Sequence, residues 1–161
     1  MISRYINIDL KLQNLELVIN DKVFKYYPIS SSIYGAGESK NSYMTPRGKH
    51  IIRAKIGKDK PIGSVFVNRR VTGETYNEGL RLTYPNRDWI LTRIIWLSGI
   101  EVGRNRLGNV DTMQRYIYIH GCPDNEKMGK IGSKGCIRMT NKDILDLFEL
   151  VHFGMSVIIR D

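Results

Sequence analysis

The chain has 161 residues, of which 25 are basic and 16 acidic, so its formal net charge at pH 7 is +9. Apolar residues make up 42% and charged residues 25%, a balance typical of a folded globular protein, and this length predicts one domain over residues 1–161. No apolar run approaches the roughly 20 residues of a membrane helix. Two cysteines are too few for a disulfide framework. The composition therefore excludes a membrane channel, a collagen-like fibre and a disulfide-stapled mini-protein.

The surplus of positive charge is spread along the chain, with one arginine doublet at Arg69-Arg70. A basic surface attracts any anionic polymer, but no arginine-rich helix is visible, so we expect no nucleic-acid partner. The first nine residues lack the basic region and apolar core of a secretory signal peptide. We therefore expect no membrane-spanning segment and no leader of this type at the start of the chain.

The early part of the chain predicts a hairpin. In residues 15–19, Leu15, Leu17 and Ile19 alternate with Glu16 and Val18. Asn20-Asp21 favours a turn, and residues 23–29 return as a second strand. A polar loop follows over residues 30–48.

The middle of the chain predicts strands separated by long loops. Residues 50–56 are rich in β-branched side chains, whereas residues 57–88 are rich in Gly, Pro, Asn and charge, which indicates short strands in long loops. Residues 93–97 and 115–119 predict two further strands, and the glycine-rich, charged segment 99–112 between them predicts a loop over a site.

One helix is predicted, after Thr140. Thr140 is a suitable N-cap residue, and Asp143 follows three positions later as in a capping box. Residues 155–159 then predict a buried strand. The expected fold is mainly β and sandwich-like, with one flanking helix towards the C-terminal part. The apolar face of the helix comprises Ile144, Leu145, Leu147, Phe148 and Val151.

A histidine and a cysteine in one short region are the candidate catalytic residues. His120 ends an apolar strand, and Cys136 lies in a glycine-flanked turn before the helix. A thiol becomes a good nucleophile as the thiolate, which a nearby imidazole and a positive local field favour. Gly135 leaves room for a substrate carbonyl, and backbone N–H groups near it can stabilise an oxyanion. On these residues alone, a purely structural role for both side chains stays open.

A zinc site is a second interpretation of the same region. His120, Cys122 and Cys136 supply three candidate ligands, but the paired C-x-x-C spacing and a fourth ligand are missing. We therefore expect no metal and no other cofactor.

The order of the motifs resembles that of the YkuD-type L,D-transpeptidases. His120-Gly121, a spacer and Ser133-Lys134-Gly135-Cys136-Ile137-Arg138 are similar to the family's His-Gly, spacer and Ser-His-Gly-Cys signature. Thr45-Pro46-Arg47-Gly48 resembles its Thr-Pro-x-Gly motif, and Gly108 to Thr112 leads into the strand before His120 in a similar way. One position departs from the pattern, because Lys134 stands where the family usually has histidine. Lys134 could lower the thiol pKa or contact a substrate carboxylate.

The resemblance implies acyl transfer on peptidoglycan stem tetrapeptides. Cys136 would attack the carbonyl before the terminal D-alanine, release D-alanine and form a thioester, and an amine of a second stem would make a 3→3 crosslink. His120 would be the base, held by the Gly121 carbonyl. Ser133 and Gly135 would support the loop. Substrate contacts are predicted for Arg138, Lys134, Tyr118 and Asn109, and more weakly for Arg106.

Several alternatives stay open on the sequence alone. Water in place of the amine would make the chain an L,D-carboxypeptidase, and a decayed site would leave a non-catalytic wall-binding module. Cys122 is either a small wall residue or a redox partner of Cys136. The resemblance implies a periplasmic or envelope location, whereas the missing leader keeps a cytoplasmic one open. We expect a monomer, and carbapenem acylation at Cys136.

Overall fold

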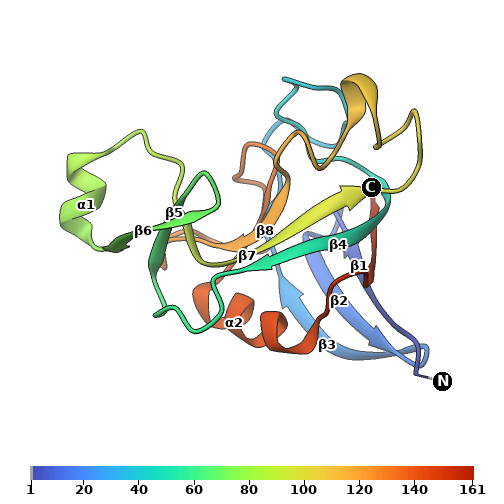
Figure 1. Ribbon diagram of the computed structural model, residues 1–161, viewed down its shortest axis with the longest axis horizontal. Coiled ribbons are helices and arrows are strands. Elements are labelled where there is room, and N and C mark those ends of the chain that lie inside the picture. The colour runs from blue at the N-terminus through green and yellow to red at the C-terminus, as the bar shows by residue number, and fades with distance from the viewer. Residues whose placement is uncertain (1) are drawn as a thin grey trace.

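The computed structural model describes residues 2–161, which form mostly β structure around one main helix (Figure 1). This confirms the predicted fold class. Neither α-helix in this part of the chain is long and apolar enough to cross a membrane. The strands are β1 (Arg4–Asp9), β2 (Asn14–Ile19), β3 (Lys22–Pro28), β4 (Gly48–Ile56), β5 (Ser64–Val67), β6 (Arg70–Thr75), β7 (Ile90–Gly99), β8 (Tyr118–Gly121), β9 (Ile137–Met139) and β10 (Ser156–Arg160). The helices are α1 (Glu78–Thr83), α2 (Asn141–Leu150) and the 3₁₀ turn Gly108–Val110.

All ten strands found in residues 2–161 belong to one hydrogen-bonded sheet. Its main path runs β3-β2-β1-β10-β4-β7-β5-β6, and β8 branches from β7 and carries β9. Two pairs are parallel, β1 with β10 and β8 with β9, and the other pairs are antiparallel. The β8–β9 branch is where the candidate catalytic residues lie.

The sheet curves around a single main core, so the fold is sandwich-like as predicted. Apolar side chains of β1, β2 and β10 share this core with those of β7, β8, β9 and α2. In Figure 1, α2 lies against the sheet beside β3, whereas α1 projects at the left of the view, at the end of the molecule away from β1, β2 and β3. Fully buried members of the core include Ile6, Leu15, Leu97, Ile119, Ile137, Leu147 and Val157.

The predicted start of α2 is confirmed. The hydroxyl of Thr140 accepts a hydrogen bond from the Asp143 amide at 3.1 Å, which satisfies one of the free N–H groups of the first turn. Ile144, Leu147 and Phe148 are buried against the sheet, and Leu145 is partly buried. The helix therefore covers the core from one side.

Two local predictions were wrong. Residues 115–119 were expected to be a strand, but Arg115 and Tyr116 form a turn and β8 begins at Tyr118. The Arg115 amide donates to the Asp111 carbonyl at 2.9 Å, and Tyr116 has a φ of 57°, which a strand does not allow. In addition, α1 lies within a segment predicted to hold only strands and loops. None of its residues is buried, so it lacks the apolar face that reveals a helix in sequence.

Candidate active site

The parallel pairing of β8 with β9 puts the predicted base and nucleophile on one face of the sheet. His120 pairs in register with Arg138, so Cys136 lies level with Tyr118. The Tyr118 amide is 3.3 Å from the Cys136 sulfur. Because side chains alternate between faces along a strand, these four side chains share one face. The residues between them, Ile119 and Ile137, point into the core instead.

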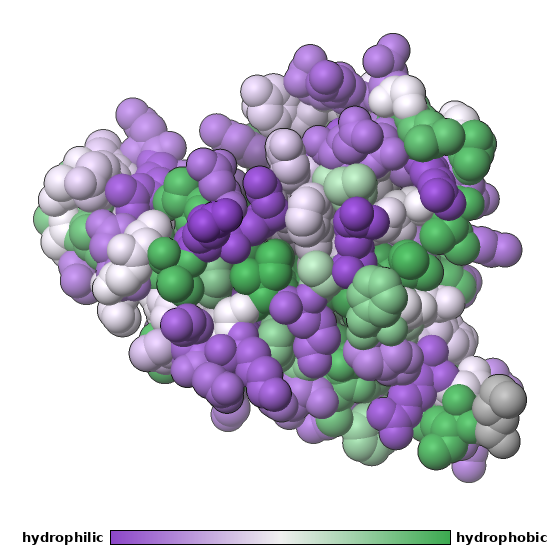
Figure 2. Space-filling view, viewed as in Figure 1, coloured by the Kyte–Doolittle hydropathy of each residue, from purple (hydrophilic) through white to green (hydrophobic). Residues whose placement is uncertain are grey.

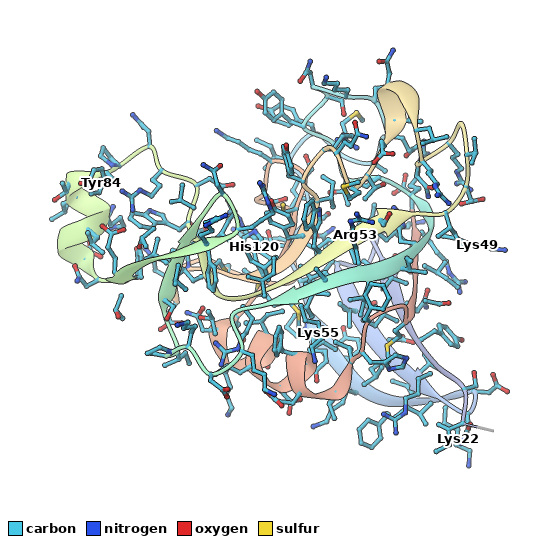
Figure 3. All side chains as sticks on the ribbon, in the orientation of Figure 1. Lys22, Lys49, Arg53, Lys55, Tyr84 and His120 are labelled. Carbon is cyan, nitrogen blue, oxygen red and sulfur yellow. The ribbon has the colours of Figure 1, made fainter. Side chains whose placement is uncertain are left out.

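His120 is fully buried, near the centre of the molecule (Figure 3). Its Nδ1 lies 2.6 Å from the Gly121 carbonyl oxygen, so Nδ1 carries the proton that it donates to that oxygen. The other ring nitrogen, Nε2, is buried without a hydrogen-bond partner among residues 2–161. Burial lowers the pKa of His120. The imidazole is therefore neutral at pH 7, with a free lone pair on Nε2 that can take a proton.

Cys136 lines a cavity of about 600 Å³, called here the thiol cavity. Burial raises the pKa of the Cys136 thiol to about 12, outweighing the Tyr118 N–H and the charges of Arg138 and Arg115, which lower it. The positive charges of Arg138 and Arg115 thus favour the thiolate, as expected, but burial has the larger effect. The resting site therefore holds a neutral thiol and a neutral imidazole.

Hydrogen bonds fix the loop that carries the thiol. The Ser133 hydroxyl donates to the Cys136 carbonyl at 2.5 Å, and the Gly135 amide reaches the Ser133 oxygen over 3.3 Å. The hydroxyl of Thr45 donates to the Gly135 carbonyl at 2.9 Å. Gly135 has a φ of 124°, a conformation that favours glycine. Ser133 and Gly135 thus occupy supporting positions, and the Gly135 amide faces Ser133 rather than open space.

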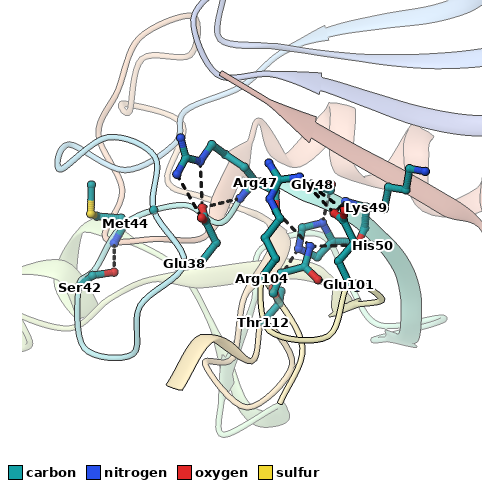
Figure 4. A network of polar contacts seen from close by, with 12 residues as sticks. Glu38, Ser42, Met44, Arg47, Gly48, Lys49, His50, Glu101, Arg104 and Thr112 are labelled. Atoms are coloured by element: carbon teal, nitrogen blue, oxygen red, sulfur yellow. Dashed lines mark hydrogen bonds and ion pairs between the residues drawn. The ribbon is translucent and has the colours of Figure 1, made fainter. Parts of the chain in front are cut away.

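The Thr-Pro-x-Gly segment is anchored by a polar network (Figure 4). Arg47 forms an ion pair with Glu38 at 3.0 Å. The buried ring of His50 contacts the Gly48 carbonyl at 3.0 Å through Nδ1 and the Thr112 hydroxyl at 2.9 Å through Nε2. Burial lowers the pKa of His50 to about 4. Since both ring nitrogens of this histidine have partners, it ties β4 to the loop before β8.

The wall of the thiol cavity is strongly cationic. The Arg115 guanidinium donates to the Met44 carbonyl at 2.7 Å and to further oxygens of residues 37–42, so it holds that loop over the thiol. Arg69 donates to the Tyr118 hydroxyl at 3.0 Å. Figure 2 shows the surface hollowed between the lobe that carries α1 and the loops above it. The cationic side chains of the cavity are Lys40, Arg69, Arg115 and Lys134.

A second cavity of about 530 Å³ adjoins the first, and Asp88 and Lys134 line both. Arg138 lines this second cavity, where it donates to the Gly132 carbonyl at 2.9 Å and lies 3.4 Å from Asp88. Arg138 therefore orders the loop before Cys136. Lys134 is exposed between the two cavities.

Sequence reasoning did not single out Asp88, Arg69 or Arg115 as site residues. They come from separate segments, and only the tertiary fold brings them to the thiol. Conversely, Asn109 and Arg106 are exposed and line neither cavity, so the structure does not bring these two predicted substrate contacts to Cys136.

Cys122, which directly follows β8, lies too far from Cys136 to be its redox partner. Cys136 is level with Tyr118, four residues before Cys122, which corresponds to about 13 Å along paired strands. A disulfide needs Cα atoms within roughly 7 Å. Cys122 is buried, and its thiol contacts the Met139 carbonyl at 3.3 Å. Cys122 is therefore a core residue that lines neither cavity, and the structure does not support the redox interpretation. Across residues 2–161, no three His, Cys, Asp or Glu side chains are grouped as metal ligands.

The chain matches a family of known proteins. The family described as the YkuD L,D-transpeptidase catalytic domain matches residues 3–159. YqjB of Bacillus subtilis, itself only provisionally named an L,D-transpeptidase, is 24% identical over 157 residues, which are 98% of this chain and 71% of YqjB.

Solved structures share the fold. An L,D-transpeptidase from Mycobacterium smegmatis has a TM-score of 0.59 at 16% identity, over 99% of this chain and 59% of that one. L,D-transpeptidase 3 from Mycobacterium tuberculosis, in complex with a faropenem-derived adduct, has a TM-score of 0.60 at 14% identity, over 99% of this chain and 61% of that one. The chain thus spans about three fifths of these two solved proteins. The match of the family over residues 3–159 shows that the chain belongs to the YkuD L,D-transpeptidase catalytic domains.

Proposed function

We propose that the chain is a cysteine acyltransferase that acts on peptidoglycan stem tetrapeptides in the cell envelope. It releases D-alanine through a thioester on Cys136 and forms 3→3 crosslinks. The observation that carries the proposal is the position of the Cys136 thiol in a cavity, on the same sheet face as His120, whose buried Nε2 has no partner. A thiol and an imidazole so placed are the elements of nucleophilic acyl transfer.

The first step follows from the two neutral groups. Burial disfavours both the thiolate and the imidazolium, so the proton moves to Nε2 of His120 as the Cys136 sulfur attacks the substrate carbonyl. The Gly121 carbonyl stabilises the imidazolium through Nδ1. His120 then returns the proton to the leaving amine of D-alanine. The Tyr118 N–H, which already faces the sulfur, stabilises negative charge as it develops there.

The cationic wall suits a substrate with free carboxylates. Lys40, Arg69 and Lys134 surround the thiol with positive charge, which attracts the carboxylates of a stem peptide. The thioester then reacts with an amine of a second stem, which gives the crosslink, or with water, which gives L,D-carboxypeptidase activity.

Mass analysis of products from a purified disaccharide-tetrapeptide tests the proposal. We expect a crosslinked dimer and free D-alanine from the unaltered protein and from Cys122→Ala, which alters a thiol outside the cavity. We expect neither product from Cys136→Ala. Monomeric tripeptide alone would assign the carboxypeptidase. Unchanged substrate, with retained binding to sacculi, would assign the wall-binding module and refute the acyltransferase.

A β-lactam offers an independent check of the thiol. The structural relative in complex with a faropenem-derived adduct has the same fold. We propose that a carbapenem acylates Cys136, because its strained amide is attacked as the stem amide is. Intact mass should show one adduct per chain in the unaltered protein and in Cys122→Ala, and none in Cys136→Ala. An unmodified mass after long incubation would contradict this.

A further inference from the structure

Asp88 occupies a singular position in the site. It precedes β7 and lines both the thiol cavity and the second cavity. Among residues 2–161 it is the one carboxylate that lines the thiol cavity, whose other charged side chains are all cationic. A ligand in the thiol cavity thus meets negative charge at this residue alone.

The neighbours of Asp88 hold it in place. On one side, Arg87 pairs with Glu74 at 2.9 Å and lies over the ring of Trp89 at 4.9 Å. On the other side, Trp89 is buried and packs edge-on against Tyr76 at 5.0 Å. Asp88 therefore lies between two anchored residues, which hold its backbone in place.

The carboxylate of Asp88 is only partly occupied. Its Oδ1 lies 3.4 Å from a guanidinium nitrogen of Arg138, a long contact. Its Oδ2 has no hydrogen-bond partner within residues 2–161, and 53% of the side chain is exposed. An incoming cation can therefore bind Oδ2 without displacing Arg138.

Asp88 also lies close enough to act on the reacting groups. Burial lowers the pKa of His120, and the Asp88 carboxylate acts against this by raising it. Burial raises the pKa of Cys136, and the Asp88 carboxylate raises it further. Its charge is thus felt at the nucleophile and the base, as expected of a group beside the path to the thioester.

We infer that Asp88 binds the cationic amine of the acyl acceptor and so sets the ratio of crosslinking to hydrolysis. The inference rests on the proposed function. The amine of the acceptor stem is protonated at neutral pH, and this ammonium group, unlike the carboxylates of the stem, is repelled by the four cations of the thiol cavity. Water carries no charge and needs no such partner. Asp88 therefore favours the amine over water at the thioester.

The chemical step balances as follows. The ammonium held at Asp88 gives one proton to solvent, and the neutral amine attacks the thioester carbonyl. His120 Nε2 takes a second proton from that nitrogen, the C–S bond breaks as the amide forms, and the sulfur leaves with the electron pair of that bond. His120 then returns its proton to sulfur, which restores the thiol.

The test measures crosslinked dimer against tripeptide from the disaccharide-tetrapeptide, in Asp88→Asn and in the unaltered protein. We expect the dimer-to-tripeptide ratio to fall about fivefold, the effect of removing one partly exposed charge pair. Asp88→Lys should lower it further. Hydroxylamine, a neutral nucleophile at pH 7, should capture the thioester equally in all three proteins.

Glu126→Gln is the matched control. Glu126 also lies near Arg138, at 3.9 Å, but lines only the second cavity. An equal fall of the ratio in this variant would assign the effect to Arg138 and overturn the inference. An unchanged ratio in Asp88→Asn, with carbapenem adduct still forming on Cys136, would overturn it as well. If the unaltered protein forms no adduct and no product, the proposed function itself fails, and this inference with it.

Discussion

Thr45 and Gly135 are ninety residues apart in the chain, yet the hydroxyl of Thr45 donates to the Gly135 carbonyl at 2.9 Å. The hydroxyl oxygen of Thr45 also accepts a hydrogen bond from the Ser32 amide at 3.1 Å. Gly135 immediately precedes the nucleophile, so this contact fixes the peptide that aims Cys136 into the cavity. The Thr-Pro-x-Gly motif thus helps to hold the loop of the cysteine motif in place, through the buried side chain of Thr45.

Thr45→Val tests this coupling. Valine has a similar shape but no hydroxyl, so the buried Ser32 amide and Gly135 carbonyl lose their partner, which should lower the free energy of unfolding by about 1–3 kcal/mol. We expect carbapenem acylation of Cys136 to slow by about tenfold or more, because the nucleophile is less well held. Thr45→Ser keeps the hydroxyl and should retain most of the rate. Equal rates in the two variants would contradict the coupling.

The glycine after His120 is required by close packing. A Cβ on Gly121 would lie 2.5 Å from Asn141 Oδ1 and 2.7 Å from the Leu91 carbonyl oxygen, and the latter belongs to the backbone of β7. Gly121→Ala should therefore lower the free energy of unfolding in urea by about 1–3 kcal/mol. It should also move the carbonyl that holds His120 and reduce D-alanine release. Gly79→Ala, in the exposed helix α1, is the control: its Cβ would meet only the Asn77 side chain, at 3.1 Å, and it should cost less than Gly121→Ala.

Alkylation kinetics can check the raised pKa of Cys136. Since burial raises it to about 12, the thiolate fraction at any given pH is smaller than that of a free thiol. In a Cys122→Ala background, the rate with iodoacetamide should keep rising up to at least about pH 10, whereas free cysteine levels off above its ordinary pKa of about 8.5. A plateau for Cys136 below pH 8 would show that the thiolate is the resting form.

The buried His50 predicts an acid-sensitive stability. Burial lowers its pKa in the folded state to about 4, so the unfolded chain binds a proton first as the pH falls. The contribution is complete above about pH 6.5 and is lost progressively towards pH 4, amounting to about 3 kcal/mol. Urea unfolding at several pH values should therefore show a shallower pH dependence in His50→Gln than in the unaltered protein. Equal pH dependence would mean that His50 does not cause the loss.

The sequence predicted correctly those elements whose residues follow a regular local pattern. The hairpin at Asn20-Asp21, the helix after Thr140 and β10 follow from alternation, capping and an apolar face. Residues 115–119 were wrongly predicted as a strand because their side chains alternate as in a strand. In the structure Arg115 lies in a turn, where its guanidinium donates to carbonyl oxygens of residues 37–44. Local alternation cannot report such a distant partner.

The candidate site divides in the same way. Cys136 and His120 stand in a compact motif, so the sequence could point to them. Their shared face depends on the parallel β8–β9 register, which sequence pattern does not specify. Asp88 sits in a charged loop that looks like any solvated loop until the fold sets it against the thiol cavity. The pKa directions were also beyond sequence, because burial decides them.

The position of β10 has a consequence for biosynthesis. This strand follows the other elements in the chain, yet it lies inside the sheet, between β1 and β4. As the chain leaves the ribosome, the hairpin of β1 and β2 has no neighbour on its open edge until β10 emerges, so the two halves of the sheet cannot join earlier. Joining of these two parts of the sheet is thus a late step of folding, because it needs pairs between strands that are far apart in the chain.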